Sequence, residues 1–193
     1  MLRRYFLITI ITAIISGIAS AQSTWKEYTF SESGIGLQLP TSPESLTETY
    51  TTPSGLTVPV IVYKATLDNV TYTVKAANFT NATIDPKTLT SDLEKEFSNI
   101  GNVAVTASAR VESYTGRQLS INEPDGSRSK VSIFFVDNRL IQLIGRSTPP
   151  DVAAGSGQVT RFIESLKFVN SSGQSIRNRS RDSSGRPGMG SGG

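Results

Sequence analysis

The 193-residue chain contains neither histidine nor cysteine. Without histidine, the Ser-His-Asp and Cys-His catalytic arrangements are excluded, as are imidazole general bases and the usual zinc, copper and non-haem iron sites. Without cysteine, thiolate ligands, redox pairs and disulfide bonds are excluded too. We therefore predict a protein that is not an enzyme, has no cofactor or metal, and is held together by its hydrophobic core alone.

A short apolar run at the N-terminus indicates the cellular compartment of the protein. Arg3 and Arg4 precede the apolar residues 6–18, which lead into the small-residue site Ala19-Ser20-Ala21. A basic region, a short apolar region and an A-x-A end are typical of a cleaved signal peptide, so residues 1–21 are predicted to be removed. The run is also shorter than the roughly twenty residues of a bilayer span, so no transmembrane anchor is expected after cleavage.

Two export routes fit this N-terminus. Arg3 and Arg4 resemble a twin-arginine signal, but Leu2 stands where that signal usually has Ser or Thr, and Ile8 where it often has Lys. The general secretory route is therefore favoured. No cysteine follows the cleavage site, which excludes a lipoprotein, and we expect an exported protein of the bacterial periplasm or exterior.

The net positive charge of the chain comes from its two ends. Residues 22–170 carry 13 Lys/Arg and 15 Asp/Glu, whereas residues 171–193 carry four arginines and one aspartate. The central part therefore lacks the clustered basic face of a nucleic-acid-binding domain, and no specific nucleic-acid partner is predicted. Its size fits a single domain over residues 22–170.

Residues 171–193 form a Gly/Ser/Arg-rich tail that is predicted to be disordered, because it has too few apolar side chains to offset the entropy of ordering. Its arginines are candidate contacts for polyanions such as lipopolysaccharide, teichoic acid or nucleic acid, and they are Arg177, Arg179, Arg181 and Arg186. A solubilising tail with no specific partner is the alternative interpretation.

Alternation of apolar and polar residues dominates the central part and predicts about nine strands. They cover residues 25–30, 35–39, 46–52, 58–67, 70–79, 103–114, 117–122, 130–136 and 140–145. Turn-forming residues separate them, namely Pro53-Ser54-Gly55, Asp68-Asn69, Tyr114-Thr115-Gly116, Pro124-Asp125-Gly126 and Asp137-Asn138. Such short connections predict antiparallel neighbours.

Two segments have helical spacing instead. In the first, Asp85 is the predicted N-cap and Pro86 the first helical residue, Gly101 closes the helix, and the apolar face consists of Leu89, Leu93, Phe97 and Ile100. In the second, Ser156 is the predicted N-cap, and the apolar face consists of Val159, Phe162, Ile163 and Leu166. Both faces are expected to pack on a sheet.

Several short motifs resemble those of bacterial exported domains with the PsbP-like fold. They are Trp25-x-x-Tyr28-x-Phe30, Gly34-Ile35-Gly36-Leu37-x-Leu39-Pro40, Gly116-Arg117-x-Leu119, Arg139-Leu140-Ile141-Gln142-Leu143 and Arg161-Phe162-Ile163-x-Ser165-Leu166. The resemblance covers about residues 25–169. It implies an α+β fold, an antiparallel β-sheet flanked by helices in an α/β/α sandwich, shared with the extrinsic oxygen-evolving-complex protein of photosystem II and a Ran-binding nuclear transport factor.

The resemblance also implies a class of function. Known members are mostly binding or assembly proteins rather than enzymes. The photosynthetic members have been associated with metal ions partly through histidine, which this chain lacks. A manganese or photosystem role is therefore not carried over, because function has to be argued from a site rather than from a fold.

The composition leaves open catalysis by carboxylate, lysine, tyrosine or serine side chains. A glycosidase needs two carboxyl groups that face each other across the scissile bond, and Glu112 and Glu123, on successive predicted strands, are a candidate pair. The simpler interpretation is that they are strand carboxylates opposite cations such as Arg117 and Lys130. A Ser-Lys dyad has no recognisable S-x-x-K motif here.

Two further segments have features of ligand sites. Residues 122–126 offer oxygen ligands for calcium, but a Pro-Asp-Gly hairpin turn explains them without an ion. Residues 154–157 are glycine-rich but do not match a phosphate-binding loop, and a flexible entry to the last helix accounts for them better.

Three functions follow from these observations. The first is an exported non-catalytic binding or assembly module of the cell envelope, which contacts a protein or envelope component through a sheet edge or a groove beside the helices. The second is a carboxylate-based enzyme or small-ligand-binding protein. The third is a polyanion-associated envelope protein that acts through its basic tail.

Overall fold

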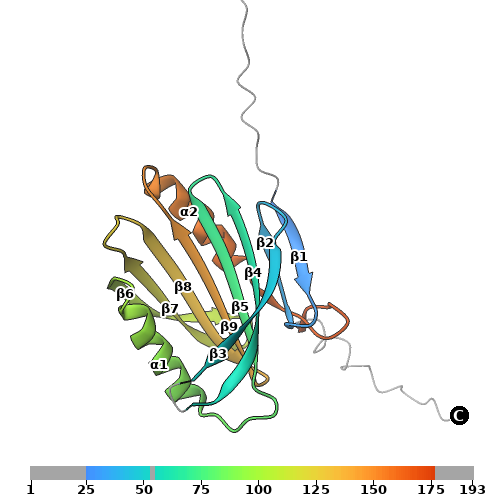
Figure 1. The fold of residues 1–193 in the computed structure, drawn as a ribbon. Coiled ribbons are helices and arrows are strands. Elements are labelled where there is room, and N and C mark those ends of the chain that lie inside the picture. The colour runs from blue at the N-terminus through green and yellow to red at the C-terminus, as the bar shows by residue number, and fades with distance from the viewer. Residues whose placement is uncertain (1–24, 53–54, 177–193) are drawn as a thin grey trace, which may run out of the picture.

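The computed structural model describes residues 25–52 and 55–176, which form two antiparallel sheets and two helices (Figure 1). The larger sheet has seven strands in the order β3-β4-β5-β9-β8-β7-β6. They are β3 (Glu44–Thr51), β4 (Thr57–Leu67), β5 (Val70–Asn78), β6 (Asn102–Val111), β7 (Tyr114–Asn122), β8 (Arg128–Val136) and β9 (Arg139–Ser147). The smaller sheet joins β1 (Lys26–Phe30), β2 (Ile35–Leu39) and β10 (Lys167–Phe168) in the order β1-β2-β10.

The large sheet consists of two runs of consecutive antiparallel strands that meet at β5 and β9. After β5 the chain passes through α1 (Pro86–Ser98) to the far edge of the sheet, and β6 to β9 then lead back to β5. The predicted nine strands and their antiparallel pairing are confirmed. The two-residue strand β10 was not predicted, because it is too short to show alternation.

Each face of the large sheet carries its own hydrophobic core and its own helix. One core joins α1 to β4, β7 and β8 through Leu89, Leu93 and Phe97, which are all buried. The other joins α2 (Val152–Glu164) and the small sheet to β5, β8 and β9, with Tyr72 and Phe162 fully buried. Helices on opposite faces confirm the α/β/α arrangement (Figure 1).

The two helices confirm their predicted apolar faces but not all of their ends. Asp85 caps α1 and accepts hydrogen bonds from the backbone N–H groups of Lys87 and Thr88. Ile100 lies beyond α1 and is exposed, and Asn99 rather than Gly101 caps the C-terminus, so these two predictions are wrong. The second helix begins four residues before the predicted cap Ser156, because Asp151 caps it and packing against the sheet offsets the low helix propensity of its two glycines.

The turn predicted at Tyr114-Thr115-Gly116 is also displaced. The chain reverses at Glu112, which has a φ of 54°, and Tyr114 already begins β7. Gly116 has a packing function instead, because a Cβ there would lie 2.6 Å from the ring of Phe134. The turn at Asp137-Asn138 is confirmed, with φ values of 49° and 57° that suit a two-residue hairpin.

The folded chain extends past the predicted boundary at Asn170. Val169 forms a β-bridge with Ser175, and Ile176 packs against the core that contains Phe168. The predicted signal peptide, residues 1–21, lies outside the described residues. In the described part of the chain, neither helix is long and apolar enough to span a membrane.

Candidate functional site

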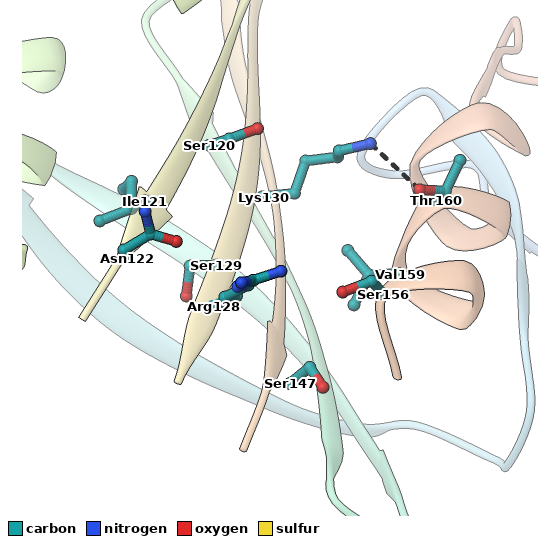
Figure 2. A pocket seen from close by; sticks show the side chains of 10 residues that line it. All are labelled: Ser120, Ile121, Asn122, Arg128, Ser129, Lys130, Ser147, Ser156, Val159 and Thr160. Carbon is teal, nitrogen blue, oxygen red and sulfur yellow. Dashed lines mark hydrogen bonds between the residues drawn. The ribbon is translucent and has the colours of Figure 1, made fainter. Parts of the chain in front are cut away.

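A groove of about 230 Å³ lies beside α2, on the sheet face that this helix covers only in part (Figure 2). Its floor is formed by β7 and β8, and one wall is formed by α2. We call it the basic groove, and its lining residues are Ser120, Ile121, Asn122, Arg128, Ser129, Lys130, Ser147, Ser156, Val159 and Thr160.

Two cations of β8 give the basic groove its charge. Successive side chains of a strand point to opposite faces, so Arg128 and Lys130 share one face while Ser129 and Val131 are buried on the other. Figure 2 shows both cations on the side of β8 that faces α2. Further along β8, Phe134 and Val136 occupy this same face and belong to the core. The polar start of β8 therefore forms the groove, and its apolar end anchors the strand.

Hydroxyl groups form the opposite wall. Thr160 accepts a 3.0 Å hydrogen bond from the Nζ of Lys130, which bridges the basic groove from β8 to α2 (Figure 2). One turn earlier in the helix, the hydroxyl of Ser156 donates to the carbonyl of Val152 at 2.8 Å. Ser147 of β9 donates to the same carbonyl at 3.2 Å. Ser147 is buried beneath the helix, whereas Ser156 is partly exposed and its oxygen remains able to accept a further hydrogen bond.

Within the described structure, no carboxylate is among the residues that line the basic groove. The acidic side chains at this end of the sheet are engaged elsewhere: Arg146 donates to Glu123 at 2.9 Å and to Asp125 at 2.5 Å. Hydrogen bonds from the Ser127 backbone N–H and from Arg146 lower the pKa of Asp125. Glu123, in turn, raises the pKa of Arg146. Arg128 therefore has no neutralising partner among the described residues.

A second groove, of about 480 Å³, lies on the other face between α1 and β7. It is larger, but Arg117 is neutralised by Glu94, to which it donates at 2.6 Å, and this leaves Lys87 as the unneutralised cation among its described lining residues. The basic groove is therefore the better candidate for binding a charged group.

The predicted glycosidase pair does not converge. Glu112 precedes β7 and Glu123 follows it, so the length of a nine-residue strand, about 30 Å, separates them. The hydroxyl of Ser175 donates to Glu112. The predicted partners are also wrong, because Arg117 pairs with Glu94 and Lys130 bonds to Thr160.

The turn over residues 122–126 confirms the hairpin interpretation. The backbone N–H of Gly126 donates to the carbonyl of Glu123 at 3.0 Å. The carboxylates of Glu123 and Asp125, which calcium would require, are both bonded to Arg146. Among the described residues, no group of three or more acidic side chains is placed to hold a metal ion.

Residues 154–157 lie inside α2, so the predicted flexible entry to this helix is wrong. Gly155 faces the sheet, and a Cβ there would lie 2.8 Å from the Cβ of Ser147 and from a methyl group of Val70. Because Gly155 has no Cβ, α2 can approach β9 closely. The predicted polyanion contacts lie outside the described residues, and they are Arg177, Arg179, Arg181 and Arg186.

The basic groove itself was not predicted. The sequence indicates Lys130 only as a partner for strand carboxylates, and no motif includes Arg128. Their alternation with Ser129 and Val131 places the two cations on one face of a strand. It does not reveal that Ser156 and Thr160 lie opposite, because that requires the packing of α2 on the sheet.

Comparison with known proteins identifies the fold. No family model matches the sequence, and no curated protein matches it either. Among solved structures, the chain is similar to cyanobacterial PsbP (CyanoP) from Synechocystis sp. PCC 6803, with a TM-score of 0.53 and 10% sequence identity. The match covers 78% of this chain and 95% of that one. Together with the two antiparallel sheets and the helices on opposite faces, it shows that this chain has a PsbP-like fold.

Proposed function

We propose that the protein is an exported, non-catalytic module of the cell envelope that binds a partner through the basic groove. The N-terminal signal-like sequence and the preference for the general secretory route support export to the periplasm or beyond. The observation that carries the proposal is the pair Arg128 and Lys130 facing hydroxyl groups across an open groove that no described carboxylate lines.

The chemistry of this groove supports binding rather than catalysis. The whole chain has no histidine to act as a base, and no carboxylate of the described residues lines the groove to replace it. Ser147 and Ser156 donate their hydroxyl protons to a main-chain carbonyl, and within residues 25–52 and 55–176 neither is bonded to a group that would activate it as a nucleophile. Fixed donors and cations are suited to holding an anionic group in place.

Site-specific photo-crosslinking of the full chain in its native host tests this function. A photoreactive residue replaces Ser120, on the floor of the basic groove, and in a control it replaces Ser91 on α1, at the opposite face. We expect a defined partner to be captured from position 120 and not from position 91. We also expect capture to persist in a chain that ends at Ile176.

Two results would contradict the proposal. Equal capture from both positions would show that the groove is not the binding surface. Capture that disappears when residues 177–193 are removed would assign the function to the basic tail and its four arginines.

A further inference from the structure

We propose that the basic groove binds two acidic side chains, at positions i and i+2 of an extended segment in a partner polypeptide. This inference rests on the proposed function and specifies the partner. It follows from the spacing of the two cations, their free hydrogen-bond donors, the size of the groove and the surface beside it.

The spacing of Arg128 and Lys130 matches that of an extended polypeptide. They are two residues apart on one face of β8, so their Cα atoms are separated by about 6.8 Å. An extended segment presents its own side chains i and i+2 on one face at the same interval. Two carboxylates at this spacing therefore each meet one cation, whereas adjacent carboxylates point to opposite sides.

Both cations have donors available. Arg128 is exposed and makes no hydrogen bond or ion pair with another described residue, so its guanidinium can donate two parallel N–H bonds to a carboxylate. Lys130 donates one of its three N–H groups to Thr160 and retains two. The groove can therefore take up two negative charges without breaking an existing contact.

The size of the groove favours side chains of a larger partner. Its volume of about 230 Å³ lies below the roughly 300–1,000 Å³ that is usual for sites of drug-sized ligands. The same sheet face continues from β7 to β6, where Ser120 lies opposite Val105 and Gln118 opposite Ala107. None of these four residues is acidic, so this surface does not repel an acidic segment that extends beyond the groove.

Two peptides of equal charge test the inference. Both are capped heptapeptides of glycine and serine with two glutamates, which are separated by one residue in the first and adjacent in the second. Each is titrated into the isotopically labelled full mature chain at low salt, and backbone amide shifts are followed by NMR. We expect saturable shifts around Arg128, Lys130 and Thr160, and about five-fold tighter binding of the first peptide, the scale of one exposed ion pair.

Variants locate the binding. Arg128→Ser and Lys130→Ser are each expected to weaken binding of the first peptide about five-fold and to remove its preference over the second. Both side chains lie outside the core, so these variants retain the fold. Lys87→Ser, which removes a cation from the groove beside α1, is the matched control and leaves binding unchanged.

Equal binding of the two peptides, or no shifts with either, would overturn the inference. So would inorganic phosphate that binds the same residues more tightly than the first peptide, since a phosphate-bearing ligand would then be favoured. The proposed function is tested by the separate crosslinking experiment, and it is rejected when position 120 captures no defined partner in the host. Capture there with equal peptide binding would retain the function and reject this partner.

Discussion

The ammonium group of Lys130 and the hydroxyl of Thr160 are joined by a 3.0 Å hydrogen bond between β8 and α2. A second polar contact holds the same helix, because the phenol of Tyr72 donates to the Oε1 of Gln158 at 2.7 Å. Ser147 of β9 also donates to the carbonyl of Val152. The wall of the basic groove is therefore attached to the sheet by side chains of three different strands, as well as by its apolar face.

Thr160→Val is expected to lower the free energy of unfolding by about 1 kcal/mol, because it removes the acceptor of the Lys130 bond while keeping the shape of the side chain. Chemical denaturation of the variant and the parent measures this. Thr160→Ser keeps the hydroxyl and serves as the control. An equal loss in Thr160→Ser, which keeps the hydroxyl, would contradict the assignment of the loss to the hydrogen bond with Lys130.

The two glycines of α2 are expected to respond in opposite ways to alanine. Gly155→Ala places a Cβ against Ser147 and Val70 and should destabilise the fold by about 1–3 kcal/mol. Gly157 has no neighbour within 4 Å of an added Cβ, so Gly157→Ala should stabilise it by about 0.5–1 kcal/mol through helix propensity. Thermal unfolding distinguishes the two, and a gain in both variants would contradict the close approach of α2.

Truncation of Phe162 tests whether α2 and the large sheet share one core. Its side chain is fully buried and packs edge-on against Tyr72, with ring centroids 5.4 Å apart. Phe162→Ala should therefore cost about 3–5 kcal/mol of unfolding free energy. Val105→Ala, at an exposed site on β6, is the control and should change stability by less than about 0.5 kcal/mol. Similar losses of unfolding free energy in both variants would show that α2 and the large sheet do not share one core.

Asp125 should contribute to the loss of stability in acid. The backbone N–H of Ser127 and the Arg146 side chain lower its pKa in the folded protein below the ordinary value of 3.8. The charged form therefore stabilises the fold above about pH 3.8, and this contribution is lost as the pH falls through the lowered pKa. Asp125→Asn should accordingly show a smaller decline in melting temperature below pH 4 than the parent chain.

Glu44→Gln is the matched control for this acid prediction. Glu44 is exposed and makes no hydrogen bond or ion pair with another described residue. The decline in melting temperature of Glu44→Gln should follow that of the parent. A decline that is shallower in Glu44→Gln than in Asp125→Asn would contradict the assignment to Asp125.

Local pattern was sufficient to predict most of the elements. In β5, alternate residues Val70, Tyr72 and Val74 are buried, and this periodicity is visible in the sequence. Asp85 and Pro86 likewise define the start of α1 from local chemistry. The start of α2 was misplaced because Gly155 disfavours a helix locally and is tolerated only through its contact with the sheet.

The basic groove depends on contacts between distant parts of the chain, which local pattern does not reveal. Lys130 and Thr160 are 30 residues apart, and they meet only because α2 packs beside β8. The sequence instead suggests Glu112 and Glu123, which look like neighbours on successive strands. The hairpin places one of them at each end of β7, so their distance is set by strand length.

The close packing of α2 on the sheet also affects how fast a partner associates. Gly155 leaves no space between the helix and Ser147, and Val159 lies against Gly145, where an added Cβ would fall 2.5 Å from it. The wall of the groove is therefore fixed before a partner arrives, and binding requires no movement of the helix. We expect association in a single kinetic phase, with a rate constant that rises as ionic strength falls, since charge-steered diffusion and not rearrangement limits it.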